Sequence, residues 1–216
     1  MSTRRVSVRR DDDVFINCPF DESYVPVFRA VVFAVCACQF VPRCALEADD
    51  GVEVRVEKII RIMKECPLSI HDISRTELDD LNHLPRFNMP FELGLYLGIA
   101  RSGRSIRRSL ILDSEPYRYQ KFLSDIAGQD IRSHSKNPEK AISHVRNWLA
   151  SAMPGRRFAG GRDICSLYRK FMSDLPDLLS ASRIEHVEIT FIDWYHLIST
   201  WLQTVNQVSR PSGIKH

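Results

Sequence analysis

The sequence predicts an α/β fold of the doubly wound, flavodoxin-like type: a mostly parallel, five-stranded sheet with helices on both faces. Short apolar runs alternate along the chain with segments whose apolar residues recur at helical spacing. This alternation is typical of strands joined by helical crossovers, which produce a parallel sheet covered on both sides. Because such crossovers are right-handed, a doubly wound order is the leading topology.

The individual elements follow from the apolar spacing and from residues that break it. Pro42 interrupts the second strand, which places that strand near a sheet edge. The predicted strands cover residues 14–17, 40–45, 68–72, 109–113 and 130–133. The predicted helices cover residues 24–35, 52–63, 88–100, 117–126 and 137–149.

The third predicted helix has several distinctive features. Asn88 is placed to cap it, and Pro90 falls where a missing N–H does no harm. Apolar residues occupy most of its faces, so we expect it to be largely buried. Gly94 and Gly98 predict a groove that another backbone or a ligand can approach. Glu92 in its first turns is then either a tied-down structural acid or a functional one.

The chain divides into three parts. Residues 1–12 are predicted to be a flexible leader, residues 13–153 the α/β domain, and residues 154–216 a C-terminal helical extension. The extension contains two helices, over residues 163–179 and from residue 190 onward, with Pro176 ending or kinking the first. Trp194 and Trp201 are seven residues apart, which indicates one packing face. The extension is a candidate surface for homo-oligomer assembly.

Composition excludes several classes of function. The 216 residues are 44% hydrophobic and 26% charged, as in ordinary globular proteins. A net charge of +3 is too weak to indicate nucleic acid binding, and no segment resembles a membrane span or a secretory signal. No pair of the six cysteines has CxxC spacing, so we expect free thiols in a cytoplasmic protein and no metal site. Cys18 is a candidate nucleophile, although no histidine is evidently paired with it.

A crevice is predicted where the strand order reverses, because ligands of open parallel sheets bind there, outside the carboxyl ends of the strands. In the predicted order this point lies between the first and third strands, and the third helix points its N-terminus at it. Carboxylates at such a crevice suit a sugar with a leaving base, since they bind hydroxyls and stabilise an oxocarbenium-like centre. The side chains expected there are Asn17, Cys18, Pro19, Phe20, Asp21, Asp72, Ser74, Asn88 and Glu92.

Two segments carry a resemblance to a known superfamily. The sequence from Ser69 to Ser74 (Ser-Ile-His-Asp-Ile-Ser), followed by the stretch from Asn88 to Gly98, resembles the core of the nucleoside 2-deoxyribosyltransferase-like and TIR-like (Toll/interleukin-receptor-like) superfamily. The opening segment from Val14 to Asp21 is similar to the family's first strand and substrate-contacting loop. The resemblance implies that Glu92 is a catalytic glutamate acting on the anomeric carbon. It implies that Asp72 contacts the sugar or assists the leaving group.

Structural roles remain open for several of these residues. Glu92 alternatively complements the dipole of its helix, and Asp72 alternatively caps a turn. Asp21 belongs either to the crevice or to the start of the first helix. Because strand side chains alternate between faces, His71 points away from Asp72 and is expected to be a core or interface histidine.

Two functions are consistent with these features. The first is an enzyme that cleaves the N-glycosidic bond of a nucleotide or nucleoside, similar to an NAD nucleosidase or a nucleoside 2-deoxyribosyltransferase. NAD or another nucleotide is then the substrate, and no cofactor is required. The second is a non-catalytic nucleotide-sensing or self-assembly module that uses the same crevice. Arg43 and Arg55 are either candidate phosphate-binding residues or solvated charges. The resemblance allows a role for either function in prokaryotic antiviral defence or signalling.

Overall fold

The structure is a computed structural model and describes residues 11–48, 50–76, 87–103 and 105–208. Its five-stranded sheet is parallel throughout, in the order β2-β1-β3-β4-β5, which confirms the predicted doubly wound, flavodoxin-like fold. The strands are β1 (Asp13–Asn17), β2 (Val41–Arg43), β3 (Leu68–Asp72), β4 (Arg108–Asp113) and β5 (Ile131–Ser133). The helices are α1 (Val25–Ala37), α2 (Arg55–Glu65), α3 (Asn88–Ser102), α4 (Pro138–Ala152), α5 (Gly161–Ser182) and α6 (Phe191–Val208).

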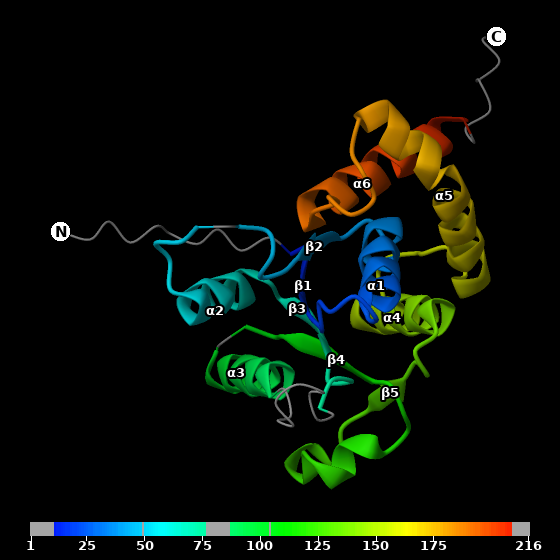
Figure 1. Cartoon of the computed structure of the whole chain (residues 1–216). Coiled ribbons are helices and arrows are strands. Elements are labelled where there is room, and N and C mark those ends of the chain that lie inside the picture. The colour runs from blue at the N-terminus through cyan, green and yellow to red at the C-terminus, as the bar shows by residue number, and fades with distance from the viewer. Residues whose placement is uncertain (1–10, 49, 77–86, 104, 209–216) are drawn as a thin grey trace.

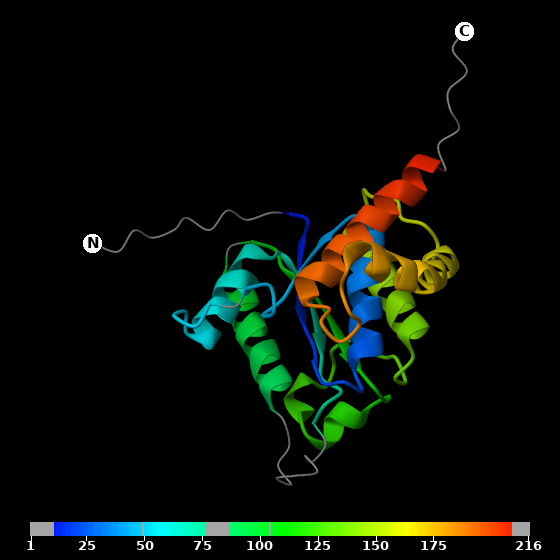
Figure 2. The ribbon, with the colours of Figure 1, turned by 45° about the horizontal axis from the view of Figure 1, so that its top comes forward.

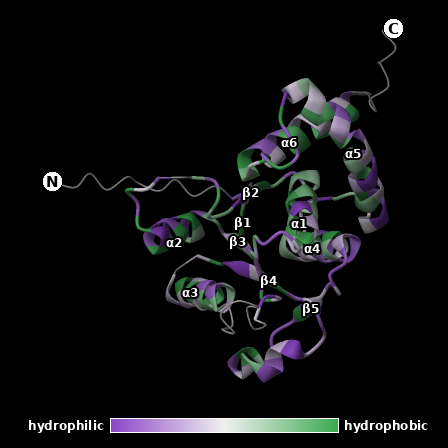
Figure 3. Cartoon of the chain, in the orientation of Figure 1, coloured by the Kyte–Doolittle hydropathy of each residue, from purple (hydrophilic) through white to green (hydrophobic). Residues whose placement is uncertain are grey.

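The helices form layers on the two faces of the sheet. Helices α2 and α3 cover one face, and α1 and α4 cover the other (Figure 1). Helices α5 and α6 pack outside α1 and α4 as a further layer, which the turned view of Figure 2 also shows. Because α1 lies between the sheet and this outer layer, it is buried almost all round, and it is mostly green in Figure 3. This placement explains why a helix so rich in valine is stable, since packing outweighs the weak helix propensity of β-branched residues.

The C-terminal helices share the core of the α/β domain. Phe171 of α5 and Trp201 of α6 both contact Phe33 of α1, with ring centroids 5.5 and 6.3 Å apart. Thr190 caps α6, because its Oγ1 accepts a hydrogen bond from the Asp193 N–H at 3.1 Å. Helix α5 continues through Pro176 to Ser182, so that proline does not end it.

Three local predictions are wrong. The segment 117–126 is not an α-helix but two 3₁₀ turns, Arg118–Lys121 and Ser124–Ile126, after Tyr117 adopts a left-handed conformation. Asn88 does not cap α3: it is the first helical residue, and Phe87 occupies the cap position without a side-chain hydrogen bond. Helix α3 is also less buried than expected, since Phe91 is 58% exposed and a side chain at Gly94 would meet nothing within 4 Å.

Some predictions lie outside the described residues. These concern most of the predicted leader, residues 1–12, and the end of the C-terminal extension after residue 208. All six cysteines fall within the described residues and are free thiols, as predicted. Among the described helices, none has the length and apolar character needed to cross a membrane.

Candidate functional site

Polar side chains gather where the parallel strands end. The register pairs Asn17 of β1 with His71 of β3, and Asp72 of β3 with Leu112 of β4. All strands run in one direction. The residues that follow β1, β3, β4 and β5 therefore lie together along the edge of the sheet formed by the carboxyl ends of the strands. This is the end of the sheet at which the sequence predicts a ligand crevice.

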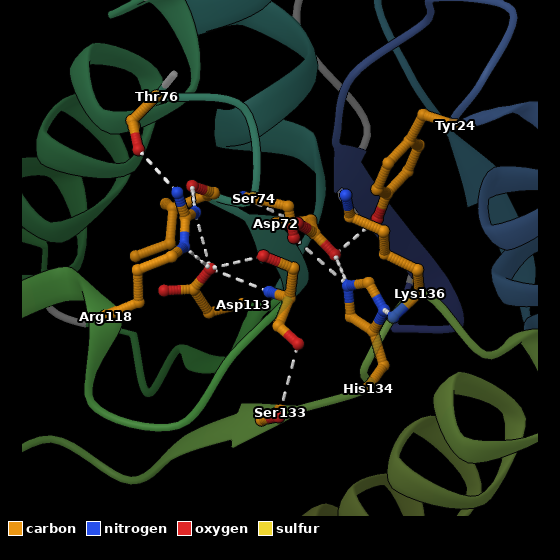
Figure 4. Close-up of polar contacts among 11 residues, drawn as sticks. Tyr24, Asp72, Ser74, Thr76, Asp113, Arg118, Ser133, His134 and Lys136 are labelled. Carbon is orange, nitrogen blue, oxygen red and sulfur yellow. Dashed lines mark hydrogen bonds and ion pairs between the residues drawn. The ribbon is translucent and has the colours of Figure 1, made fainter.

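Asp72 is the centre of a buried hydrogen-bond network. Its Oδ2 accepts from the hydroxyl of Tyr24 on the segment before α1, and from Nε2 of His134, 2.9 Å away, just after β5. Its Oδ1 accepts from the backbone N–H of Ser74 at 2.8 Å. The Lys136 N–H donates to His134 Nδ1 at 3.1 Å, so Nδ1 is an acceptor and Nε2 carries the proton. Figure 4 shows these side chains converging on Asp72 from three segments of the chain.

The network keeps Asp72 charged but seals it from solvent. Burial raises the pKa of this carboxyl, but the hydrogen bonds from His134, Ser74 and Tyr24 outweigh burial, so its pKa lies below the usual value. Asp72 has no exposed surface, and both carboxylate oxygens already accept hydrogen bonds. It is therefore arranged to position its neighbours rather than to contact a sugar directly.

The loop that holds His134 has a strained backbone. Ser135 and Lys136 both adopt left-handed conformations, with φ of 51° and 56°. For residues other than glycine this region is disfavoured, and such residues persist only where surrounding contacts impose the geometry. The strain brings the Lys136 N–H onto the imidazole of His134. Strained residues of this kind are concentrated at functional sites, which supports this edge of the sheet as the candidate site.

A second buried acid lies at the end of β4. Asp113 Oδ1 accepts from Nε of Arg118 at 2.9 Å, and the same guanidinium donates to the Ile73 carbonyl and to Thr76 Oγ1 (Figure 4). Arg118 therefore ties the end of β4 to the segment that follows β3. This ion pair fixes the chain on the side of Asp72 opposite His134.

Asn17 connects the end of β1 to the start of α3. Its Nδ2 donates to the Met89 carbonyl and to Nδ1 of His71, both at 3.0 Å. His71 is a core histidine, as predicted: it has no exposed surface, its ring lies 5.2 Å from that of Tyr96, and burial lowers its pKa to about 3. The bond to Met89 holds the first turn of α3, and with it Glu92, beside the carboxyl ends of β1 and β3.

Glu92 differs from the other acids at this edge. It is 6% exposed, yet it makes no hydrogen bond with any residue that the structure describes. Burial raises its pKa to about 7, and the positive charge of Arg55 only partly opposes that shift. A nearly buried carboxyl without a fixed partner and with a pKa near neutrality is typical of catalytic acids and bases.

Cys18 directly follows β1 and is influenced by both predicted acids. Its thiol is buried, and burial followed by the charge of Asp72 raises its pKa well above the usual value, with Glu92 contributing in the same direction. The thiol therefore stays protonated, which makes it unsuited to act as a nucleophile. Asp72 and Glu92 therefore both lie within electrostatic range of Cys18.

The remaining predicted residues separate into two groups. Ser74 joins the site through its Oγ, 3.1 Å from His134 Nε2, and Asp21 lies at its rim, where Arg75 Nε donates to it at 2.9 Å. Phe20 turns toward α1 instead, with its ring 5.4 Å from that of Phe28. Pro19 is buried beside it in the chain, and Asn88 is exposed at the start of α3.

Arg43 is not part of this group. Its guanidinium donates to Asp13 at 2.6 Å, and also to Glu47 and Glu65. These carboxylates hold it near the start of β1 and the end of α2, which is the opposite end of the strands. Of the two candidate phosphate-binding arginines, Arg55 is the one whose charge acts on Glu92.

A small cleft of about 100 Å³ opens above the Asp72 network. Tyr24, Ser74 and Lys136, which all belong to that network, line it together with Arg75. Within the described ranges, no group of three or more histidine, cysteine, aspartate or glutamate residues has the arrangement of a metal site. No family model, curated protein or solved structure matches this chain.

Sequence reasoning missed four residues of the site: Tyr24, Asp113, His134 and Arg118. Asp113 ends the predicted fourth strand, as Asp72 ends the third. His134 directly follows the predicted fifth strand, so the rule that selected Asp72 at the end of the third strand also applies to it. The rule does not apply to Arg118, which reaches the site from a 3₁₀ turn, or to Tyr24, which is the residue before α1.

Proposed function

We propose that this protein cleaves the N-glycosidic bond of a nucleotide or nucleoside, with Glu92 as the catalytic carboxyl. The observation that carries the proposal is the state of Glu92: nearly buried, without a hydrogen-bond partner among the described residues, and with a pKa of about 7. The resemblance to nucleoside 2-deoxyribosyltransferase-like and TIR-like proteins supports the same residue. NAD is one member of the proposed substrate class.

The proposed chemistry uses the charge of Glu92. Cleavage of the bond from the sugar to the base builds positive charge on the anomeric carbon. A carboxylate in surroundings of low polarity stabilises such a charge much more strongly than one in water. Asp72 is then a positioning residue, since its bonds to His134 and Ser74 fix the loops beside the crevice.

A substrate panel tests the proposal. The full chain is incubated, at several concentrations that allow for assembly, with NAD and with purine and pyrimidine nucleosides, and release of the free base is followed by chromatography. We expect release from at least one substrate, and its loss in Glu92→Gln. The control is Glu57→Gln, which changes an exposed glutamate in the first turn of α2.

A binding module without turnover is the second candidate, because one of the two predicted acids has no exposed surface. Calorimetry distinguishes the two functions. Nucleotide binding to the wild type with no base release, and with weaker binding in Glu92→Ala, favours the module. Unchanged binding in Glu92→Ala, together with no base release by the wild type, excludes the crevice for both functions.

A further inference from the structure

A second cavity lies at the sheet edge formed by β5, between α4 and α5. We call it the α4–α5 pocket. Its volume is about 620 Å³, within the range of cavities that bind small molecules. Its lining includes Glu139, Lys140, Ser143, His144, Arg162 and Arg169. Neither Asp72 nor Glu92 lines it, so it is separate from the crevice.

Positive charge dominates this pocket. Lys140, Arg162 and Arg169 are its cationic side chains, and Glu139 is the one carboxylate among its lining residues. Nη1 of Arg169 donates to Glu139 at 2.7 Å, which orients the guanidinium and leaves its other N–H groups available. Arg162 has no ion pair with any residue that the structure describes. The pocket therefore has an excess of cations that the protein itself does not neutralise.

His144 lies in the wall of the pocket. Its Nε2 lies 3.0 Å from the Ser133 carbonyl, which fixes the ring in the pocket wall. Burial lowers the pKa of His144, and the charges of Arg132 and Lys140 lower it further, against the effect of that carbonyl. A bound anion would offset these charges and raise the pKa of His144.

The start of α5 adds hydrogen-bond donors at the same place. Gly160, at its cap position, supplies no side-chain acceptor, and no acceptor among the described residues is bonded to the N–H groups of Gly161 and Arg162. A Cβ on Gly161 would lie 3.6 Å from Ser143 Oγ, so this first turn packs against the pocket wall. Free N–H groups at the N-terminus of a long helix favour an anion, and Asp163 in the same turn offsets part of this attraction.

We propose that the α4–α5 pocket binds a small phosphate-bearing molecule, held by Arg162, Lys140 and Arg169. Arginine donates pairs of hydrogen bonds that match phosphate oxygens, and lysine adds a point charge. Arg162 and Arg169 are seven residues apart on one helix, roughly 10 Å along its axis. The pocket therefore accommodates a phosphate together with an attached group of nucleoside size.

Calorimetric titration of the full chain with inorganic pyrophosphate and with AMP tests this proposal. We expect saturable binding of at least one probe, weakened about tenfold in Arg162→Gln and in Lys140→Gln. Lys170→Gln is the matched control, because Lys170 is exposed on α5 and does not line the pocket. The second readout is NMR titration of His144, whose pKa should rise when the probe is bound. Preserved circular dichroism establishes that each variant folds.

Several results would overturn the proposal. These are the absence of saturable binding to the wild type, equal weakening in Lys170→Gln, or an unchanged His144 titration in the presence of a bound probe. A single-stranded oligonucleotide could also bind more tightly than either probe and be weakened by Lys170→Gln. That result would show that these basic residues form a nucleic acid-binding surface instead. Glu92→Gln should keep full binding in this pocket, so the outcome is independent of the proposed activity in the crevice.

Discussion

The imidazole of His134 lies 2.9 Å from the carboxylate of Asp72, which joins the chain after β5 to the end of β3. The two residues are far apart in the sequence, and β4 lies between their strands in the sheet. The contact therefore connects the carboxyl ends of β3 and β5 across the end of β4. Together with Tyr24 and Ser74, it makes Asp72 the point at which three loops are held together.

Replacing Asp72 should destabilise the fold. Asp72→Asn leaves the buried donors of His134 and Tyr24 with a weaker, neutral acceptor, so we expect the free energy of unfolding to fall by roughly 2–4 kcal/mol at pH 7. Because the folded pKa of Asp72 lies below its usual value of 3.8, its contribution is present above about pH 4 and is lost at lower pH. Urea denaturation at several pH values measures both effects. The exposed Asp125→Asn is the control, and an equal effect of the two variants would refute the positioning role.

Relieving the strained loop should stabilise the protein. Lys136 is exposed and has a φ of 56°, a conformation that glycine adopts without penalty. Lys136→Gly should therefore raise the free energy of unfolding by roughly 1 kcal/mol. The same change at Lys170, within α5, should lower it by roughly 1 kcal/mol, since glycine is a poor helix former. Thermal denaturation compares the two variants, and shifts in the same direction would contradict the assignment of strain.

Glu92 should make the protein less stable as the pH rises. Its pKa is about 7 in the folded state, against an ordinary value of 4.5, so the folded state binds the proton more tightly. The contribution of Glu92 to the free energy of unfolding is therefore highest below about pH 4.5. It falls by up to roughly 3 kcal/mol as the pH rises through 7. Glu92→Gln should remove that dependence and be more stable than the wild type at pH 8. Denaturation of both proteins between pH 5 and 8 measures the difference. A parallel pH dependence in the two proteins would show that Glu92 titrates normally.

The sequence allowed the fold to be predicted because its signals are local. Five apolar runs separated by helical spacing determine a parallel sheet, and the positions of Asp72 and Glu92 near one edge follow from the strand order. The burial of each acid could not be predicted, because it depends on tertiary contacts. Asp72 is sealed by Tyr24 and His134, which lie 48 and 62 residues away in the sequence.

The role of Arg43 also depends on tertiary contacts that could not be predicted from the sequence. At the end of a strand, its sequence position is compatible with a phosphate-binding residue as well as with a structural one. Only the folded chain brings Asp13 and Glu65, from β1 and α2, to its guanidinium. The capping prediction at Asn88 has a more local cause, because the helix begins one residue earlier than a cap at this position requires.

The most direct test of the account is the rate of base release by the wild type and by Glu92→Gln, measured from pH 5.5 to 8.5. If the carboxylate form of Glu92 stabilises the transition state, the wild-type rate rises with pH and reaches half its plateau near pH 7. We predict that Glu92→Gln is slower at the plateau by at least about 100-fold and lacks this rise. Equal rates in the two proteins, or a rise that persists in Glu92→Gln, would contradict the account.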